Sequence, residues 1–435
     1  MDGGDRCLEL SVRVACFSLL ALYFAPGNMN LKQSLQPYRA KAAAWGDALR
    51  LAFGGRPGAA VDAELCRKPV ILLVCEANIP RLERMIKYLR PLRSEQFVLL
   101  CRRSKFRAGF HQAIADIPVY LYENPAQLRA LLLQFKEVKL VHAFESRSKF
   151  QNIARKQLKA PFIFDCQDLS VIYHGLHPPV PWIRRNLNDE KACLEGADHV
   201  IAHSLEYNQA ARLYGIPKKP VTFFPFYLDD DAVKERINKP SEEALRMIYL
   251  GGLGDAATRN PFNLTLYGKA LARLGIGLDV YPSPLTPASI TDAYAAYAVG
   301  QPGFRLCKPV PSNELGAVTA RYHYGFIPFF KTAGDQTIGP FKFKYGTTLK
   351  MVNYVEAGLG VVCSEDFEWQ AWLVKRYGIG IIAPNLDQGL LPEALGNPEV
   401  RASCEANIRK HTDAWLLSVQ IHRIAAVYER LTGTR

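Results

Sequence analysis

A cation near the start of a short predicted helix is the strongest chemical feature of this sequence. Thr347 and Thr348 are suited to cap a helix, and the apolar spacing predicts that helix over residues 349–357. The N–H groups in the first turn of a helix have no partner inside the helix, so they attract anions. Two further polar side chains lie on the same face as Lys350, namely Asn353 and Tyr354. Because Lys350 adds a full positive charge in the first turn, the stretch predicts a phosphate site.

The spacing that continues from this helix is typical of one family of enzymes. Gly358 suits the left-handed position that ends a helix, and residues 361–363 predict a buried strand. The run from Lys350 through Tyr354 and Gly358 to the strand resembles the nucleotide-sugar motif of the retaining GT-B glycosyltransferases of group 1. In that family the lysine position faces the donor diphosphate, and a glutamate holds the nucleotide ribose where this chain has Asn353. An ordinary helix-to-strand connection is the competing interpretation of the same residues.

A glycine-rich segment follows an apolar strand predicted near residues 246–251. Gly252 and Gly254 supply half of a dinucleotide fingerprint, but the third glycine is missing, which disfavours an oxidoreductase. The resemblance implies instead that this loop approaches the donor diphosphate and that Arg259 binds its phosphates. A second run, at residues 196–204, also resembles the family.

Alternating strands and helices must position these residues. The periodicity predicts strands at 70–75, 96–101, 119–121, 138–144 and 161–165, with helices at 80–89, 125–135 and 149–158 between them. Such alternation specifies a parallel, doubly wound sheet, and it continues beyond residue 246. We therefore expect an α/β protein with two Rossmann-like doubly wound parallel-sheet domains, and the resemblance implies that these form the GT-B fold. The expected ranges are an N-terminal helical extension at 1–65, an acceptor domain at 66–228, a nucleotide-sugar domain at 242–401 and a C-terminal crossover helix at 402–435.

Acidic and histidine side chains follow strands of the first predicted sheet. Ligands of open α/β sheets gather beyond the carboxyl ends of the strands, where His142, Asp165, Asp168 and His174 fall. Similar GT-B proteins carry acceptor-side residues there, so the resemblance makes these four our catalytic candidates. A helix cap or a packing role is the local alternative for each of them.

Positive charge is concentrated in the first predicted domain. Of a net charge of +13, residues 66–160 hold 19 Lys and Arg against 7 Asp and Glu, or +12, and the rest holds 35 against 34. Six residues make up two clusters at one edge of the sheet, namely Arg81, Arg84, Lys87, Arg90, Arg102 and Arg103. We expect them to bind an anionic membrane surface or an anionic acceptor, with a solvated basic surface as the alternative. Nucleic acid is disfavoured, because no reading helix, zinc module or ribonucleoprotein motif accompanies the charge.

Several other features bound the function. The chain of 435 residues is 49% hydrophobic and can bury a large core, and its ten isolated cysteines favour reduced thiols over disulfides or zinc. The apolar run at 14–24 is shorter than a membrane span, and residues 31–53 predict a basic amphipathic helix that could anchor at a membrane or pack on the first domain. Residues 341–345 predict a basic-aromatic loop that could stack a nucleobase or form a strand edge. At the C-terminal end, residues 402–431 predict one long helix.

The resemblance implies a glycosyltransferase of the hexosyl type that needs no cofactor and no metal. Its partners would be a nucleotide diphosphate sugar as co-substrate, a glycan or lipid-linked hydroxyl acceptor, and an anionic membrane surface. We expect a cytoplasmic protein, peripheral at the membrane face, in cell-surface polysaccharide or glycolipid synthesis. The alternative is a catalytically decayed GT-B-like protein that binds glycan or membrane, with Asn353 marking the lost donor site.

Overall fold

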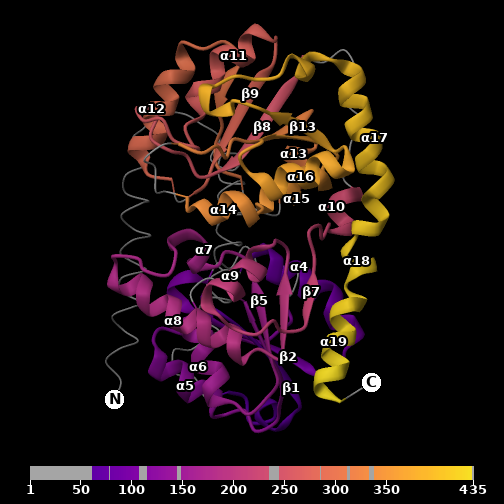
Figure 1. The fold of residues 1–435 in the computed structure, drawn as a ribbon. Coiled ribbons are helices and arrows are strands. Elements are labelled where there is room, and N and C mark those ends of the chain that lie inside the picture. The colour runs from indigo at the N-terminus through magenta and orange to yellow at the C-terminus, as the bar shows by residue number, and fades with distance from the viewer. Residues whose placement is uncertain are drawn as a thin grey trace, which may run out of the picture. The chain divides into compact units, whose positions relative to one another are not determined.

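Two parallel β-sheets with flanking helices follow one another along the chain in the computed structural model (Figure 1). The residues that the structure describes are 61–77, 79–106, 115–144, 148–234, 244–284, 286–310, 314–332 and 338–433. The apolar run at 14–24 and the amphipathic helix expected at 31–53 lie outside these residues. Within them, no helix is both long and apolar enough to cross a bilayer.

The first half is a seven-stranded parallel sheet in the order β3-β2-β1-β4-β5-β6-β7. β1 (Val70–Cys75) is buried along its whole length, as its unbroken apolar run predicts for a central parallel strand covered on both faces. The other strands are β2 (Gln96–Arg102), β3 (Val119–Tyr122), β4 (Val138–Phe144), β5 (Phe162–Cys166), β6 (His199–Ala202) and β7 (Val221–Phe223). The helices are α4 (Pro80–Leu89), α5 (Pro125–Leu132), α6 (Lys149–Gln157), α7 (Ser170–His174), α8 (Pro181–Gly196) and α9 (Glu206–Tyr214).

The second half is a six-stranded parallel sheet in the order β10-β9-β8-β11-β12-β13. Its strands are β8 (Arg246–Gly251), β9 (Gly277–Pro282), β10 (Phe304–Leu306), β11 (Tyr324–Ile327), β12 (Gly360–Ser364) and β13 (Gly380–Ala383). Its helices are α11 (Gly268–Arg273), α12 (Ala288–Val299), α13 (Leu315–Thr319), α14 (Pro340–Tyr345), α15 (Leu349–Glu356) and α16 (Glu368–Tyr377). The strand order reverses beside β8, so a crevice for ligands is expected beyond the carboxyl ends of β8 and β11. Two doubly wound parallel sheets confirm the fold class predicted from the periodicity.

The chain passes between the two halves twice, and the two passages pair with each other. The Leu417 N–H donates to the Leu228 carbonyl at 2.8 Å, and the Leu228 N–H donates to the Trp415 carbonyl at 2.9 Å. The first passage leads into α10 (Asp230–Lys234), and the second joins α17 (Pro398–Trp415) to α18 (Leu417–Gln420) and α19 (His422–Thr432). Our prediction of one continuous final helix was wrong, because Leu416 is extended where it pairs with Leu228.

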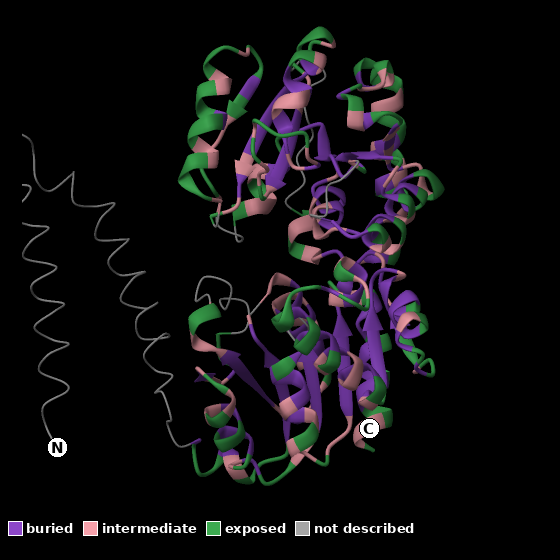
Figure 2. Cartoon of the chain, turned by 60° about the vertical axis from the view of Figure 1, so that its left-hand side comes forward, coloured by how far each residue is buried: buried purple, intermediate pink, exposed green. Residues whose placement is uncertain are grey.

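Burial follows the layers of the two halves. Figure 2 shows buried strands inside each half and helices whose outer faces are exposed. The described cysteines are all free thiols, which agrees with the prediction of reduced cysteines. Short 3-10 segments complete the chain at Leu65–Arg67, Arg90–Leu92, Arg103–Lys105, Leu264–Tyr267, Leu386–Gln388 and Glu393–Gly396.

Candidate functional site

The carboxyl end of β8 meets the side chain of Lys350. β8 ends at Gly251, which has a φ of +129°, a conformation that favours glycine. A Cβ atom at this position would lie 2.9 Å from Cε and 3.1 Å from Nζ of Lys350. The backbone conformation therefore favours glycine here, and any larger residue would displace the Lys350 ammonium from its position. Gly252, predicted to approach a diphosphate, follows directly in this loop.

The Lys350 ammonium has aromatic neighbours and no anionic partner. Its Nζ lies 5.4 Å from the ring centroids of both Tyr249 and Phe329, within cation–π range. Among the described residues it makes no hydrogen bond and no ion pair. Burial lowers the pKa of Lys350 to about 8, although the Asp168 carboxylate acts to raise it. A cation held in this way is suited to accept an anion from solution.

The start of α15 adds N–H donors beside Lys350. Thr348 is the N-cap in extended conformation, but its side chain makes no capping hydrogen bond, and its buried Oγ1 finds no partner in the described ranges of the chain. Gln370 accepts a hydrogen bond from the Thr348 N–H at 3.1 Å and so fixes the turn. The first N–H groups of α15 have no partner inside the helix. Thr347 is buried next to this turn, and Gly358 is left-handed, as predicted.

A buried lysine joins the first sheet to this site. Lys342 of α14 donates to Asp168 at 2.7 Å and to Glu206 at 2.6 Å, and its Nζ lies 5.2 Å from the Tyr173 ring centroid. Burial opposes the charged form, but the two carboxylates outweigh it and raise the pKa of Lys342 well above its usual range. Asp168 is half-exposed and close enough to Lys350 for that charge to help lower its pKa. The site therefore combines two lysines from the second half with a carboxylate from the first.

Residues 341–345 form the helix α14 rather than the basic-aromatic loop that we expected. Pro340 occupies its first turn, where a missing N–H has no cost, and Gly339 precedes it in extended conformation. Lys342 and Phe343 are both buried and not free to stack on a base. Lys342 contacts the first half, whereas Phe343 packs edge-on against Phe367 within the second half.

Two of the four catalytic candidates lie in the interior instead of at an open sheet edge. His142 is 0% exposed and Asp165 is 1% exposed. His142 Nδ1 lies 2.6 Å from the Tyr428 hydroxyl of α19, and burial lowers the pKa of this histidine. Asp165 forms an ion pair with Arg81 of α4. The expectation that they follow the ends of strands was wrong, because His142 lies within β4 and Asp165 within β5. Their contacts with Tyr428 of α19 and Arg81 of α4 keep both side chains in the interior.

The other two catalytic candidates remain accessible. Asp168 contacts Lys342 and accepts a hydrogen bond from the Tyr173 hydroxyl at 3.3 Å. His174 ends α7, is exposed, and lies beside Tyr173 with a ring-centroid distance of 6.2 Å. Of the four, Asp168 is the one that the fold brings near Lys350.

The remaining donor-site candidates separate into different surroundings. Arg259 donates to the Asp387 carbonyl and lies 3.2 Å from the Asp387 carboxylate, so the structure turns it toward 386–388 rather than to Lys350. Gly254 leaves room for Asn260, whose amide closes the loop 254–263. Tyr354 is fully buried, with its ring against Gly325 and its hydroxyl accepting from the Leu250 N–H at 3.2 Å. Tyr354 therefore supports the sheet beneath the site. Our expectation that its phenol would face a ligand together with Lys350 was wrong.

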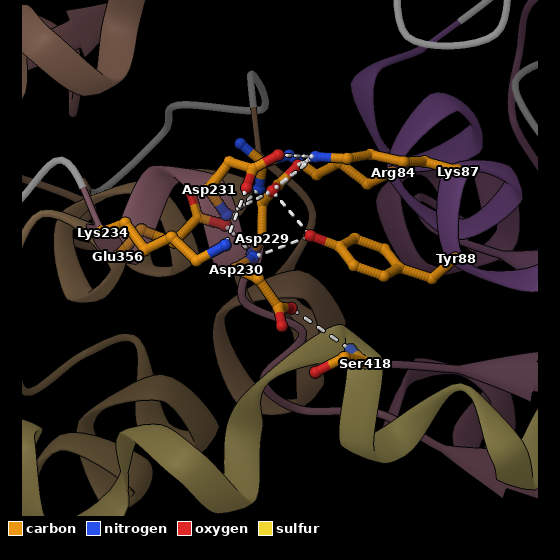
Figure 3. Close-up of polar contacts among 9 residues, drawn as sticks. All are labelled: Arg84, Lys87, Tyr88, Asp229, Asp230, Asp231, Lys234, Glu356 and Ser418. Carbon is orange, nitrogen blue, oxygen red and sulfur yellow. Dashed lines mark hydrogen bonds and ion pairs between the residues drawn. The ribbon is translucent and has the colours of Figure 1, made fainter.

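Asn353 contacts the first half through Arg84. Arg84 of α4 donates to Asn353 Oδ1 at 3.2 Å, and it also donates to Glu356 Oε1 at 2.7 Å (Figure 3). Lys87 lies 2.9 Å from Asp229, whose N–H donates to Glu356 at 2.8 Å. Figure 3 shows Arg84 and Lys87 of α4, Asp229 just before α10 and Glu356 of α15 converging, so they fix α15 to the first passage between the halves. Asp229, Asp230 and Asp231 therefore make structural contacts here.

The expected membrane-facing stripe is paired within the protein. Arg81 is 1% exposed and binds Asp165 and His203, so it cannot reach a lipid headgroup. The others pair with acidic residues, namely Arg84 with Glu356, Lys87 with Asp229, Arg90 with Asp116, Arg102 with Glu76 and Arg103 with Glu123. The spacing of these cations along the sequence predicted a basic surface, but it did not reveal the carboxylates that pair with them.

Four contributors to the site were not identified from the sequence. Lys342, Glu206, Gln370 and Phe329 come from segments without a motif. The basic-aromatic run did draw attention to residues 341–345, but only the packing of α14 selects Lys342 from that run.

Comparison with solved structures identifies the fold. HepE from Anabaena in complex with UDP-glucose is 13% identical, with a TM-score of 0.62 over 82% of this chain and 98% of that one. A glycosyltransferase from Rickettsia africae is 12% identical, with a TM-score of 0.60 over 84% and 98% of the chains. Sucrose-phosphate synthase from Thermosynechococcus elongatus is 15% identical, with a TM-score of 0.58 over 84% and 100%. No family model and no curated protein matches the sequence. The chain has the GT-B fold, as the sequence predicted, and the reaction must be argued from the site.

Proposed function

We propose that this protein transfers a sugar from a nucleotide diphosphate donor to a hydroxyl acceptor. The observation that carries the proposal is the Lys350 ammonium, which lies against Gly251 at the start of α15 without an anionic partner among the described residues. The structural neighbour HepE is titled as a complex with UDP-glucose, which supports a nucleotide sugar as the ligand. Asp168, across from Lys350, is the residue that we assign to the acceptor side.

Lys350 and the start of α15 would act on the leaving group. Negative charge grows on the diphosphate as the glycosidic bond breaks, and donors fixed where that charge develops stabilise the transition state more than the ground state. The ammonium and the free N–H groups of α15 are held in place by Phe329 and Gln370 before any ligand arrives. We further propose a retaining hexosyl transfer that needs no metal, on cell-surface polysaccharide or glycolipid precursors at the cytoplasmic membrane face.

A panel of nucleoside diphosphates tests the donor site directly. A ligand at a hundred times its dissociation constant adds about 2.7 kcal/mol of stability, which thermal unfolding detects. We expect UDP, GDP or ADP to raise the midpoint in the presence of EDTA, and Lys350→Met to abolish the shift. The absence of a shift with all three nucleotides would contradict the proposal.

Donor affinity should fall as the pH rises through about 8. The Lys350 ammonium is charged below its pKa of about 8 and loses its charge above it. Because an anionic ligand binds the charged form, the dissociation constant of UDP-glucose should rise by up to about tenfold per pH unit above pH 8. Calorimetric titration between pH 7 and 9.5 measures this slope. The Lys350→Met variant should bind weakly with no slope, and a slope that survives in this variant would assign the titration to another group.

The second candidate function is a protein that binds glycan or membrane without transfer activity. Arg84 already holds the Asn353 carbonyl oxygen, so Asn353 is not placed to accept a ribose hydroxyl as the family glutamate would. Nucleotide binding without donor-dependent transfer to any acceptor would favour this candidate.

A further inference from the structure

The loop between α7 and α8 and the first turn of α8 carry an exposed apolar and basic surface. Three large apolar side chains are exposed there, with Leu176 at 40%, Val180 at 36% and Trp182 at 50%. Arg184 and Arg185 are also exposed, and neither makes an ion pair within the described residues. Residues 174–185 contain no Asp or Glu. We call residues 176–185 the α7–α8 surface.

The local backbone presents these side chains on a stiff support. Gly175 ends α7 with a φ of +67°, and three prolines follow at 178, 179 and 181. Pro181 is the first residue of α8, and Ile183 and Leu187 are buried and anchor that helix. Trp182 and Arg185 are three residues apart and share a helix face. The exposed parts of the three apolar side chains are therefore carried on a backbone with little conformational freedom.

We propose that the α7–α8 surface docks on an anionic lipid bilayer. Tryptophan sits favourably at the headgroup level, arginines are attracted to anionic lipids, and exposed apolar tips gain by entering the interface. A polyanion without bases, such as heparin, would use the arginines but not the leucine, valine and tryptophan, and a nucleic acid would leave the leucine and valine unused. The stripe expected to serve this purpose is neutralised by its own carboxylates, whereas Arg184 and Arg185 have no such partner in the described part of the chain.

The position of this surface links it to the site. α7 begins two residues after Asp168, and its Tyr173 contacts Lys342. On the proposed function, docking would place the acceptor side of the site close to the lipid surface, which favours a lipid-linked acceptor. The docking itself can be measured without any donor.

Vesicle sedimentation of the full chain tests the proposal. We expect binding to vesicles of phosphatidylcholine with one third phosphatidylglycerol and little binding to phosphatidylcholine alone. Arg184→Gln with Arg185→Gln should weaken this binding about 30-fold, at the usual strength of two arginines near an anionic surface. The matched control is Arg409→Gln with Lys410→Gln, an exposed pair on α17, which should change binding little.

The Trp182→Ser variant distinguishes binding to a bilayer from binding to any polyanion. It should weaken vesicle binding about tenfold, as loss of a half-buried aromatic predicts, and leave binding to heparin unchanged. The proposal is overturned if the full chain does not bind the anionic vesicles, if both charge pairs weaken binding equally, or if Trp182→Ser has no effect. Nucleotide-induced stabilisation of the same variants should be unchanged, so a failure of docking is distinct from a failure of the donor site.

Discussion

Replacing Lys350 with methionine is expected to lower the rate of sugar transfer by about 10²–10³-fold, measured as kcat/KM with a nucleotide-sugar donor. Methionine keeps much of the apolar stem that lies over Tyr249 and Phe329 but removes the ammonium. The lost interaction is strongest when charge has developed on the diphosphate, so kcat should fall as well as donor affinity.

The matched control for this variant is Lys375→Met on α16. Lys375 is exposed in the same half of the protein, so its removal changes the net charge equally without touching the site. We expect near-normal transfer in the control. Equal rates for Lys350→Met and the parent protein would remove Lys350 from the reaction and leave α15 with a structural role.

Replacing Lys342 with methionine is expected to lower the free energy of unfolding by about 3–5 kcal/mol, which is typical when one partner of a buried ion pair is removed. The Lys342 side chain is 3% exposed and that of Glu206 is 2% exposed, so the glutamate would be left buried without its cation. Burial already raises the pKa of Glu206 to about 7, so without Lys342 its carboxyl must either take up a proton or remain as a buried charge, and both cost stability. Asp168 is half-exposed and can be solvated, so Glu206 should account for most of the loss. Chemical denaturation followed by far-ultraviolet circular dichroism measures the change.

A double variant identifies the source of that loss. Lys342→Met with Glu206→Gln removes both buried charges and should recover part of the stability lost in Lys342→Met. Lys344→Met provides the control, because this neighbouring lysine on α14 is exposed and should change stability little. If the double variant were no more stable than Lys342→Met, the contribution of Lys342 would come from packing rather than from its charge.

These predictions depend on contacts of two kinds, which differ in how far they can be read from a sequence. Lys350, Thr348 and Gly358 belong to local signals, because a helix start and a left-handed helix end depend on near neighbours in the chain. Their positions could therefore be predicted, together with the two doubly wound sheets. The sequence prediction named Gly252 and Gly254, but the glycine that lies against Lys350 is Gly251. Lys342 and Glu206 are 136 residues apart and come together only when α14 packs on α9.

The sequence by itself determined the order of strands and helices, the start of α15 and the two doubly wound parallel sheets, because each depends on periodicity and on turn residues. Only the tertiary structure decided which charges remain available. Arg81 and Asp165 were predicted to bind different ligands, yet they form an ion pair with each other in the interior. Arg84 pairs with Glu356, which is 272 residues away in the sequence. An unpaired charge is costly when it is buried, so each buried cation needs a carboxylate beside it. These carboxylates come from distant parts of the chain, and the spacing of cations along a single helix cannot reveal them.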